Sequence, residues 1–397
     1  MEPLPDGARA CRVDIVARPR PASAIRIELW LPARARWSGR YYQMGNGGFA
    51  GTIDRPTLVA AAARGDAVAA TDTGHHGNGF DASWASGRRD LVLDYAFRSI
   101  KVTADTARRL IGGYYARPAR WRYVMGCSYG GRQALVAAAR WPNDWDGVLA
   151  GAPAYDWPGT LTGFARIAKV VEQAGSGTDA VARAIEREGY PGADADPAEW
   201  RQWIFQPDPD APSQRRFAIA AFRHLFGAGP AWTPANFEPA RDVPPAWAEA
   251  AFAVGDLGAF FRKGGKLLSY FGRADPVLPP ASAPAHWRSL AARAGGEAAM
   301  SRSYRLFLVP NMAHCQGGAG PTAFGQSLKA PSLRDDAQHD VRRSLERWVE
   351  QGLPPRELVA TTGPGEQPAR TAVMLPYSPT AEPAARPRLS RSSAEPR

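Results

Sequence analysis

The chain has 397 residues, of which 45% are hydrophobic and 22% are charged, and its formal net charge is +11. This composition supplies enough apolar material for a large buried core and excludes a disordered or fibrous protein. The positive charge comes mostly from arginines scattered along the chain, with no basic run and no nucleic-acid-binding motif, so we expect no nucleic-acid partner.

Alternating polar and apolar residues open the chain. Residues 12–17 and 24–30 alternate with a period of two, which predicts antiparallel strands with one covered face. Further on, short apolar runs predict buried strands at 41–44, 67–71, 123–126, 266–271 and 304–309. Between them, helical patterns span 56–64, 90–115, 133–140 and 335–351. Strands that alternate with helices predict a mostly parallel sheet with helices on both faces.

Residues 159–261 break this alternation. The segment is rich in Pro, Ala and aromatic residues and has no clear series of strands. We therefore expect residues 1–158 and 262–377 to form one α/β core, with residues 159–261 inserted into it as a reduced, helical or irregular lid. Residues 378–397 are dominated by Pro, Ala, Ser and Arg, so we expect a disordered C-terminal tail.

The strongest local signal is the sequence Gly-Cys-Ser-Tyr-Gly-Gly at residues 126–131. It follows an apolar run and precedes an alanine-rich helix, which is the context of a G-x-S-x-G nucleophile elbow. Glycines two residues before and two after Ser128 remove side chains that would clash in so sharp a turn. The turn places the Ser128 hydroxyl at a helix N-terminus, where negative charge is favoured. We therefore predict that Ser128 is a nucleophile in an α/β-hydrolase fold.

Two other interpretations of this motif stay open. It can be a glycine-rich turn of an unrelated α/β protein, with no chemistry. Cys127 can also be the nucleophile, but an elbow centred on Cys127 would be flanked by Met125 and Tyr129, and neither has the small side chain that the turn requires.

A base and an acid for this serine are expected in two later loops. A serine hydroxyl needs a histidine to take its proton and an acid to fix the histidine tautomer. His314 follows an apolar strand near the C-terminal end of the core, and Asp275 follows the expected strand 266–271. Taken alone, either residue can be a loop-capping group. The chain order Ser–Asp–His is that of α/β hydrolases, so we predict the triad Ser128, Asp275 and His314.

The tetrahedral intermediate of acyl transfer also needs N–H donors, which form an oxyanion hole. One is expected from the backbone amide of Tyr129, the residue after the nucleophile. The other is expected from Gly47 or Gly48 in the glycine-rich loop 45–51, because glycines bring bare backbone close to a substrate carbonyl. The alternative for this loop is a plain connecting turn.

Two of the three cysteines flank the predicted triad. Cys127 precedes the nucleophile, and Cys315 follows the base. If the nucleophile and the base lie within hydrogen-bond reach, these cysteines are close enough to form a disulfide. Loop-closure entropy would then stabilise the fold by about 4–5 kcal/mol. The alternative is two free thiols; Cys11 has no evident partner.

The sequence resembles the tannase/feruloyl esterase family, which includes the mono(2-hydroxyethyl) terephthalate hydrolases. The resemblance covers residues 11–376, and the pairs Cys127-Ser128 and His314-Cys315, with a disulfide between them, are a family hallmark. Other matching segments are Cys11-Arg-Val, Leu31-Pro, Trp37-Ser-Gly-Arg, 45–51, Thr71-Asp-Thr-Gly-His75, 126–135, 146–153 and Ala274-Asp-Pro.

The resemblance implies hydrolysis of small esters of aromatic acids, feruloyl, galloyl or related, through an acyl-enzyme. It assigns Ser128 as nucleophile, Asp275 as orienting acid and His314 as base, in agreement with the pattern of the residues themselves. The segment Asp72–His75 matches the family pattern, and we interpret it as structural, shaping a loop near the site. For such a reaction we expect that no cofactor is needed.

The chain also departs from this family. Members usually carry a larger lid with its own disulfides and an aspartate-rich calcium loop, whereas the lid expected here contains no cysteine. Four of its aspartates lie among prolines, so we predict no calcium and no other metal; they are Asp194, Asp196, Asp208 and Asp210. Because the lid supplies specificity in this family, the preferred acid and alcohol stay open.

The compartment is left with two interpretations. The family is largely secreted or periplasmic, which suits a disulfide. The sequence as given shows neither a signal peptide nor an apolar window long enough to span a membrane. Either the chain starts elsewhere, or it is cytoplasmic with reduced thiols.

Three rival functions also stay open. An acyltransferase would pass the acyl group to an alcohol held in a dry pocket under the aromatic lid. A non-catalytic binding protein on the same scaffold would be signalled by a lost triad residue, and none is lost. A redox-regulated enzyme would be silenced when the disulfide Cys127–Cys315 is reduced.

Overall fold

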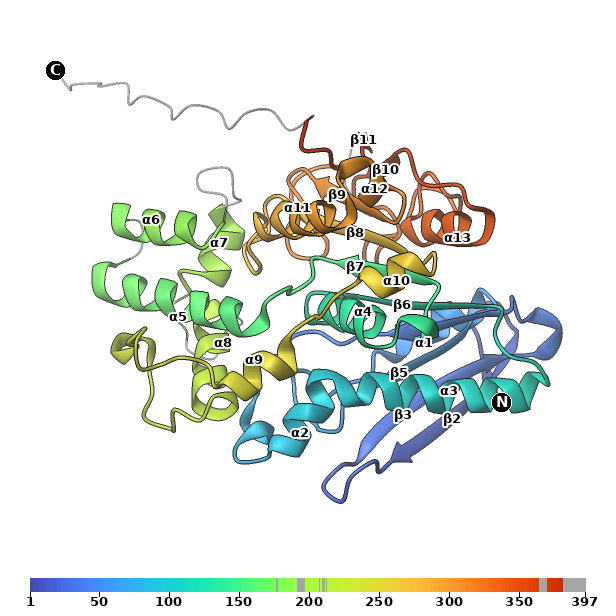
Figure 1. The fold of residues 1–397 in the computed structure, drawn as a ribbon, viewed down its shortest axis with the longest axis horizontal. Coiled ribbons are helices and arrows are strands. Elements are labelled where there is room, and N and C mark those ends of the chain that lie inside the picture. Colours follow the sequence, from blue (N-terminus) through green and yellow to red (C-terminus); the bar gives the residue numbers. More distant parts are fainter. Residues whose placement is uncertain are drawn as a thin grey trace.

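A nine-stranded sheet forms the centre of the protein, which we describe from a computed structural model covering residues 1–175, 178–190, 197–206, 208, 211, 213–363 and 370–380 (Figure 1). The strand order is β1-β2-β3-β5-β4-β6-β7-β8-β9. Strands β4 to β9 run parallel, and β1, β2 and β3 add an antiparallel edge. The strands span Glu2–Pro3, Arg9–Ala17, Ile25–Pro32, Arg40–Met44, Ala67–Thr71, Trp121–Cys127, Gly147–Gly151, Lys266–Gly272 and Tyr304–Val309, in the order β1 to β9.

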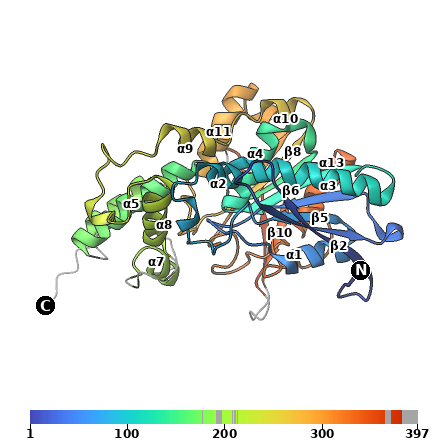
Figure 2. The same cartoon turned by 90° about the horizontal axis from the view of Figure 1, so that it is seen from below.

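Helices cover both faces of this sheet. Side chains alternate along each strand, so that in β6 Val124 enters one core while Tyr123 and Met125 enter the other. The first core is closed by α3 (Ser99–Tyr115) and α4 (Tyr129–Arg140), and the second by α1 (Arg55–Ala63) and α13 (Val341–Gln351). Figure 2 shows α3 and α1 on opposite sides of the sheet. The predicted α/β-hydrolase architecture is therefore confirmed.

Two predicted helices differ from the structure. The helix expected at 335–351 begins only at Val341, because the Asp340 side chain accepts hydrogen bonds from the N–H groups of Arg342 and Arg343 and so caps it. The helix expected at 90–115 is α2 (Arg89–Leu93) and α3 joined by a π-helical turn, Asp94–Arg98. Such turns insert one extra residue and frequently lie at functional sites.

Between β7 and β8, the described residues form helices and no strand. These are α5 (Trp157–Ala174), α6 (Asp179–Arg187), α7 (Pro197–Trp203), α8 (Gln214–Ala220), α9 (Ala246–Phe252) and α10 (Gly258–Arg262). Figure 1 shows α5 to α8 gathered beside one end of the sheet. That residues 159–261 act as a lid stays a prediction, and Asp194, Asp196, Asp210 and residues 381–397 of the tail lie outside the described residues.

Several elements have no counterpart in the sequence analysis. Strand β7 is one, because Gly-Val-Leu-Ala-Gly is too short and too rich in small residues to show a period. The others are β1, α11 (Ser282–Ala294), α12 (Glu297–Ser301) and the hairpin of β10 (Leu358–Thr361) and β11 (Thr371–Met374). Among the helices that the structure describes, none is long and apolar enough to cross a membrane.

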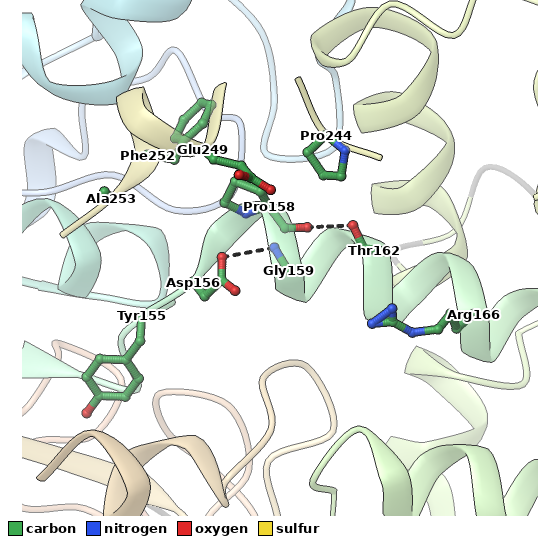
Figure 3. Close-up of a pocket in the computed structure, with 10 residues that line it drawn as sticks. All are labelled: Tyr155, Asp156, Pro158, Gly159, Thr162, Arg166, Pro244, Glu249, Phe252 and Ala253. Carbon is green, nitrogen blue, oxygen red and sulfur yellow. Dashed lines mark hydrogen bonds between the residues drawn. The ribbon is translucent and has the colours of Figure 1, made fainter. Parts of the chain in front are cut away.

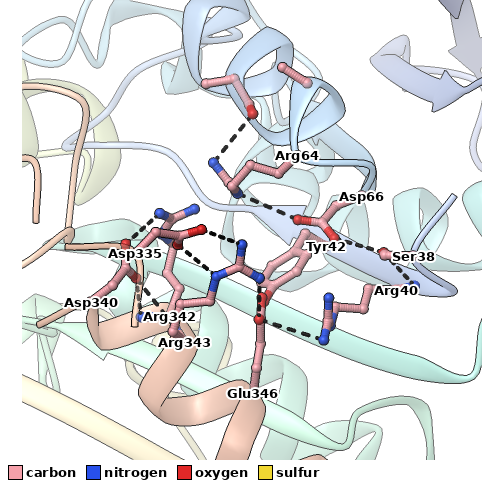
Figure 4. A network of polar contacts seen from close by, with 12 residues as sticks. Ser38, Arg40, Tyr42, Arg64, Asp66, Asp335, Asp340, Arg342, Arg343 and Glu346 are labelled. Atoms are coloured by element: carbon pink, nitrogen blue, oxygen red, sulfur yellow. Dashed lines mark hydrogen bonds and ion pairs between the residues drawn. The ribbon is translucent and has the colours of Figure 1, made fainter. Parts of the chain in front are cut away.

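A network of charged side chains ties α13 to β4 (Figure 4). The Tyr42 hydroxyl donates to Glu346 at 2.6 Å, and Arg343 donates to the same carboxylate at 2.9 Å. Nearby, Asp66 is buried, with Arg64 at 3.6 Å, and burial raises the pKa of Asp66 to about 6. The network lies on the face of the sheet that α1 and α13 cover, and it anchors the helix that follows the His314 loop.

Candidate active site

Ser128 occupies the sharp turn between β6 and α4. Its backbone has φ 62° and ψ −127°, a conformation that is strained for a residue with a side chain. A Cβ atom on Gly126 would lie 2.6 Å from the carbonyl carbon of Gly130, and one on Gly131 would lie 2.5 Å from the oxygen of Gly151. Both glycines are therefore required by the close approach of backbone. The predicted nucleophile-elbow geometry is present.

His314 and Asp275 form a hydrogen-bonded pair. Nδ1 of His314 lies 2.7 Å from Oδ2 of Asp275, whose side chain is fully buried. The other carboxylate oxygen, Oδ1, accepts the backbone N–H groups of Val277 at 2.8 Å and Leu278 at 2.9 Å. A carboxylate can only accept, so the hydrogen sits on Nδ1. Nε2 of His314 is thus left as a proton acceptor, the state that a general base requires.

A disulfide joins the loop of the histidine to the elbow. Cys127 and Cys315 are bonded, with 5.9 Å between their Cα atoms, as predicted. Each cysteine is the chain neighbour of a predicted catalytic residue, so the bond holds Ser128 and His314 in adjacent loops. Among the described cysteines, Cys11 is free and half-buried in β2.

The glycine-rich loop 45–51 packs directly against the elbow. A Cβ atom on Gly45 would lie 2.7 Å from Cα of Gly130, and the N–H of Asn46 donates to Oε1 of Gln133 in α4 at 2.8 Å. Among the contacts found for this part of the chain, no hydrogen bond is donated by the N–H of Gly47 or Gly48. Tyr129 is the first residue of α4, so its N–H has no acceptor within the helix. The three predicted oxyanion donors therefore lie in two adjoining segments.

Two side chains that the sequence analysis did not assign to the site hold this loop. The Tyr95 hydroxyl donates to the carbonyl of Gly48 at 2.6 Å, and Nε2 of His75 lies 2.8 Å from the carbonyl of Phe49. His75 belongs to the segment interpreted above as shaping a nearby loop, and the structure places it in contact with the glycine-rich loop 45–51. No sequence signal marks Tyr95, because its role depends on the π-helical turn.

Aromatic side chains pack around the same loop. The ring of Phe217 in α8 lies 5.5 Å from the ring of Phe49, between centroids, and Trp157 lies 5.4 Å from it. The ring centroid of Phe80 lies 4.6 Å from that of Phe217 and 6.1 Å from that of Trp203. Phe80 and Trp203 are both half-buried. Phe49, Trp157 and Phe217 are buried in this cluster. The half-buried rings of Phe80 and Trp203 are therefore its partly exposed members next to the predicted oxyanion hole.

One cavity adjoins the elbow. It has a volume of about 270 Å³, and its wall includes Gly47, Gly126 and Cys127. A second cavity, of about 580 Å³, opens where α9 passes the start of α5, and none of the predicted site residues lines it (Figure 3). There Asp156 accepts the N–H of Gly159 and so caps α5.

The described residues contain no group of three or more His, Cys, Asp or Glu side chains that could hold a metal ion. The absence of calcium and of any cofactor stays a prediction. Asp208 is the single member of the four predicted lid aspartates that lies among the described residues.

Comparisons with known proteins agree with this geometry. The tannase and feruloyl esterase family matches residues 9–187 and 248–389. An uncharacterized esterase of Xanthomonas campestris is 31% identical over 91% of this chain and 79% of its own length. Feruloyl esterase C of Talaromyces stipitatus is 28% identical over 90% of this chain and 80% of its own length.

A solved structure extends the comparison to the fold. Feruloyl esterase B of Aspergillus oryzae superposes with a TM-score of 0.81 at 23% identity, over 94% of this chain and 86% of its own. At that identity the likeness shows the fold alone. The fold and the serine elbow are those of an α/β hydrolase. The chain belongs to the tannase and feruloyl esterase family, and it is a carboxylic-ester hydrolase.

Proposed function

We propose that the chain hydrolyses esters of aromatic acids through an acyl-enzyme on Ser128. The observation that carries the mechanism is the pair of Asp275 and His314, 2.7 Å apart, held beside the elbow by the disulfide. Support for the aromatic acid comes from the aromatic rings next to the glycine-rich loop 45–51. Relatives named feruloyl esterase point in the same direction.

In the first half of the reaction, Oγ of Ser128 attacks the ester carbonyl while its proton passes to Nε2 of His314. Buried Asp275 stabilises the imidazolium that forms. The oxygen of the tetrahedral intermediate accepts hydrogen bonds from the N–H groups of Tyr129 and of Gly47 or Gly48. Collapse of the intermediate breaks the bond to the alcohol, which leaves with the proton from His314.

In the second half, water repeats the same steps. His314 takes a proton from water as the water oxygen attacks the acyl carbon. The second tetrahedral intermediate then collapses by breaking its bond to Oγ of Ser128, which takes the proton back from His314 as the aromatic acid is released. The chain's own residues account for every proton transfer in both halves.

The test is a panel of esters offered to the wild type and to Ser128→Ala: methyl ferulate, methyl gallate, mono(2-hydroxyethyl) terephthalate and p-nitrophenyl acetate. We expect turnover of the aromatic-acid esters by the wild type and its loss in the variant. Activity that survives the substitution overturns the role of Ser128. A preference for p-nitrophenyl acetate over all three aromatic-acid esters overturns the substrate class, and turnover that requires an added alcohol assigns an acyltransferase instead.

A further inference from the structure

Two buried side chains from outside the glycine-rich loop 45–51 contact its backbone. His75 follows β5, and Tyr95 lies in the π-helical turn before α3. His75 is 6% exposed and Tyr95 is fully buried. Each is 2.6 to 2.8 Å from one of two successive backbone carbonyls, those of Gly48 and Phe49.

The contact of His75 is transmitted along the loop by planar peptide groups. In a trans peptide, the C=O and the N–H point in opposite directions. The carbonyl of Phe49, held by His75, and the N–H of Ala50 belong to one peptide group. The N–H therefore points away from His75, and it donates to the carbonyl of Gly47 at 3.0 Å. The carbonyl of Gly47 is thereby held in turn, so the N–H of Gly48 in the same peptide group must point to the opposite side.

Tyr95 holds the peptide group between Gly48 and Phe49. Its hydroxyl holds the carbonyl of Gly48, and the N–H of Phe49 in the same peptide group donates to the carbonyl of Gly79 at 2.8 Å. The Tyr95 ring stacks on that of Tyr129, with 4.2 Å between centroids and 3° between planes. One side chain therefore touches both segments that supply the predicted oxyanion donors.

The surroundings of His75 place a hydrogen on Nε2 of its ring. The Phe49 carbonyl can only accept, so the hydrogen lies on Nε2. Nδ1 lies 3.2 Å from the Thr73 hydroxyl, and the ring stacks on Trp84 with 3.8 Å between centroids. This packing leaves the imidazole one orientation, which suits a support rather than a proton carrier.

We propose that His75 and Tyr95 are positioning residues that hold the peptide groups of the loop 47–50 so that the N–H of Gly48 faces the reacting carbonyl. This inference rests on the proposed function, since it assigns these residues to the oxyanion hole of the Ser128 reaction. Without either contact, the peptide group concerned keeps only the hydrogen bond of its N–H, and a glycine-rich segment can then rotate that group and withdraw the donor.

The first test is Tyr95→Phe, which removes only the hydroxyl. Its control is Tyr115→Phe, since the buried Tyr115 hydroxyl donates to the carbonyl of Pro32 at 2.8 Å, the same kind of bond in another part of the core. We expect kcat on the preferred ester to fall about 10- to 100-fold in Tyr95→Phe, below the 10²- to 10³-fold effect of removing an oxyanion donor itself. We expect KM to stay within about twofold, because the donor acts on the transition state.

The second test separates donation from packing at His75. His75→Gln keeps an N–H near the position of Nε2, whereas His75→Phe keeps only the ring that stacks on Trp84. The control is His286→Phe. The ring of His286 is also stacked, with 4.2 Å between its centroid and that of Tyr155, but its Nε2 has no partner in the described structure. We expect His75→Phe to lose kcat as Tyr95→Phe does and His75→Gln to recover most of it. Equal losses in both His75 variants overturn the role of the N–H.

A direct probe of the hole is an arylboronic acid, which forms a tetrahedral adduct on the serine oxygen. We expect Tyr95→Phe to weaken boronate binding by the same factor as kcat and to leave binding of the product acid unchanged. A folded Tyr95→Phe with wild-type kcat, or a loss equal to that of Tyr115→Phe, overturns the positioning role alone. A wild type that hydrolyses none of the panel overturns the proposed function and this role with it. If Tyr95→Phe does not fold, the comparison of His75→Gln with His75→Phe decides.

Discussion

Oδ2 of Asp275 accepts a hydrogen bond from Nδ1 of His314 at 2.7 Å, while Oδ1 of the same carboxylate accepts two backbone N–H groups. The carboxylate is therefore satisfied on both oxygens and is fully buried. The carboxylate cannot rotate without leaving at least one of these donors unpaired. The imidazole that it orients is consequently confined to one tautomer and one direction.

Asp275→Asn tests this arrangement. The NH₂ group of the new amide can face the N–H groups of Val277 and Leu278, which leaves donors opposed to donors. It can instead face Nδ1 of His314, and the imidazole then adopts the tautomer with its hydrogen on Nε2. We expect kcat to fall about 10⁴-fold with a small change in KM. Steady-state kinetics on the preferred ester measure both, and a variant that keeps more than a tenth of wild-type kcat contradicts the assigned role.

Gly45→Ala tests the contact between the glycine-rich loop 45–51 and the elbow. The new methyl group would lie 2.7 Å from Cα of Gly130, so the two backbones must separate. We expect a loss of about 1–3 kcal/mol in the free energy of unfolding and a lower kcat. The control is Gly113→Ala, because a Cβ at that helical position meets no atom within 4 Å. Wild-type kcat in a folded Gly45→Ala protein would show that the contact does not set the donor.

The disulfide predicts sensitivity to thiol reductants. Its sulfurs join residues 188 positions apart, so reduction releases a long loop and should cost about 4–5 kcal/mol of stability. Because the bond also holds the loops of Ser128 and His314 together, we expect dithiothreitol to lower both the melting temperature and the esterase rate. Cys11→Ser should respond like the wild type. An unchanged melting temperature and esterase rate in the reductant would contradict a redox role for the disulfide.

His75 predicts an increase in stability with pH. Burial lowers its pKa to about 4, from the ordinary 6.5, with His76 lowering it further and Asp81 and the Phe49 carbonyl raising it. Between about pH 4 and 6.5 the unfolded chain binds more protons at this residue than the folded chain does, so its contribution to stability is lost as the pH falls through 4. Melting temperatures of the wild type should drop more steeply than those of His75→Gln over this range; parallel curves would refute the lowered pKa.

Asp66 predicts a decrease in stability as the pH rises. Burial raises its pKa to about 6 from the ordinary 3.8, despite Arg64 and the Ser38 hydroxyl. Between these values the folded chain binds more protons at Asp66, so its contribution is present below about pH 3.8 and is lost as the pH rises through 6. Asp66→Asn should therefore gain stability relative to the wild type as the pH rises from 4 to 7. A constant difference between the two proteins over that range would rule this out.

Residue types in local patterns were enough to predict much of this protein. The elbow at Ser128 needs glycines on both sides whatever surrounds it, and loops that carry Asp275 and His314 follow strands with recognisable apolar runs. The same patterns, with the cysteines beside the serine and the histidine, indicated the fold, the family and the disulfide. Such features depend on backbone geometry within a few residues, which the chain encodes directly.

The tertiary structure alone decided how the glycine-rich loop 45–51 is held. Tyr95, which donates to the carbonyl of Gly48, lies in the π-helical turn Asp94–Arg98, whereas the sequence analysis gave one unbroken helix over residues 90–115. The contact of His75 with Phe49 joins two loops through a side chain, and Gln133 reaches Asn46 from another element. Each contact depends on where separate segments come to lie after the sheet has assembled, because a hydrogen bond requires partners within about 3 Å, whatever their separation in the sequence.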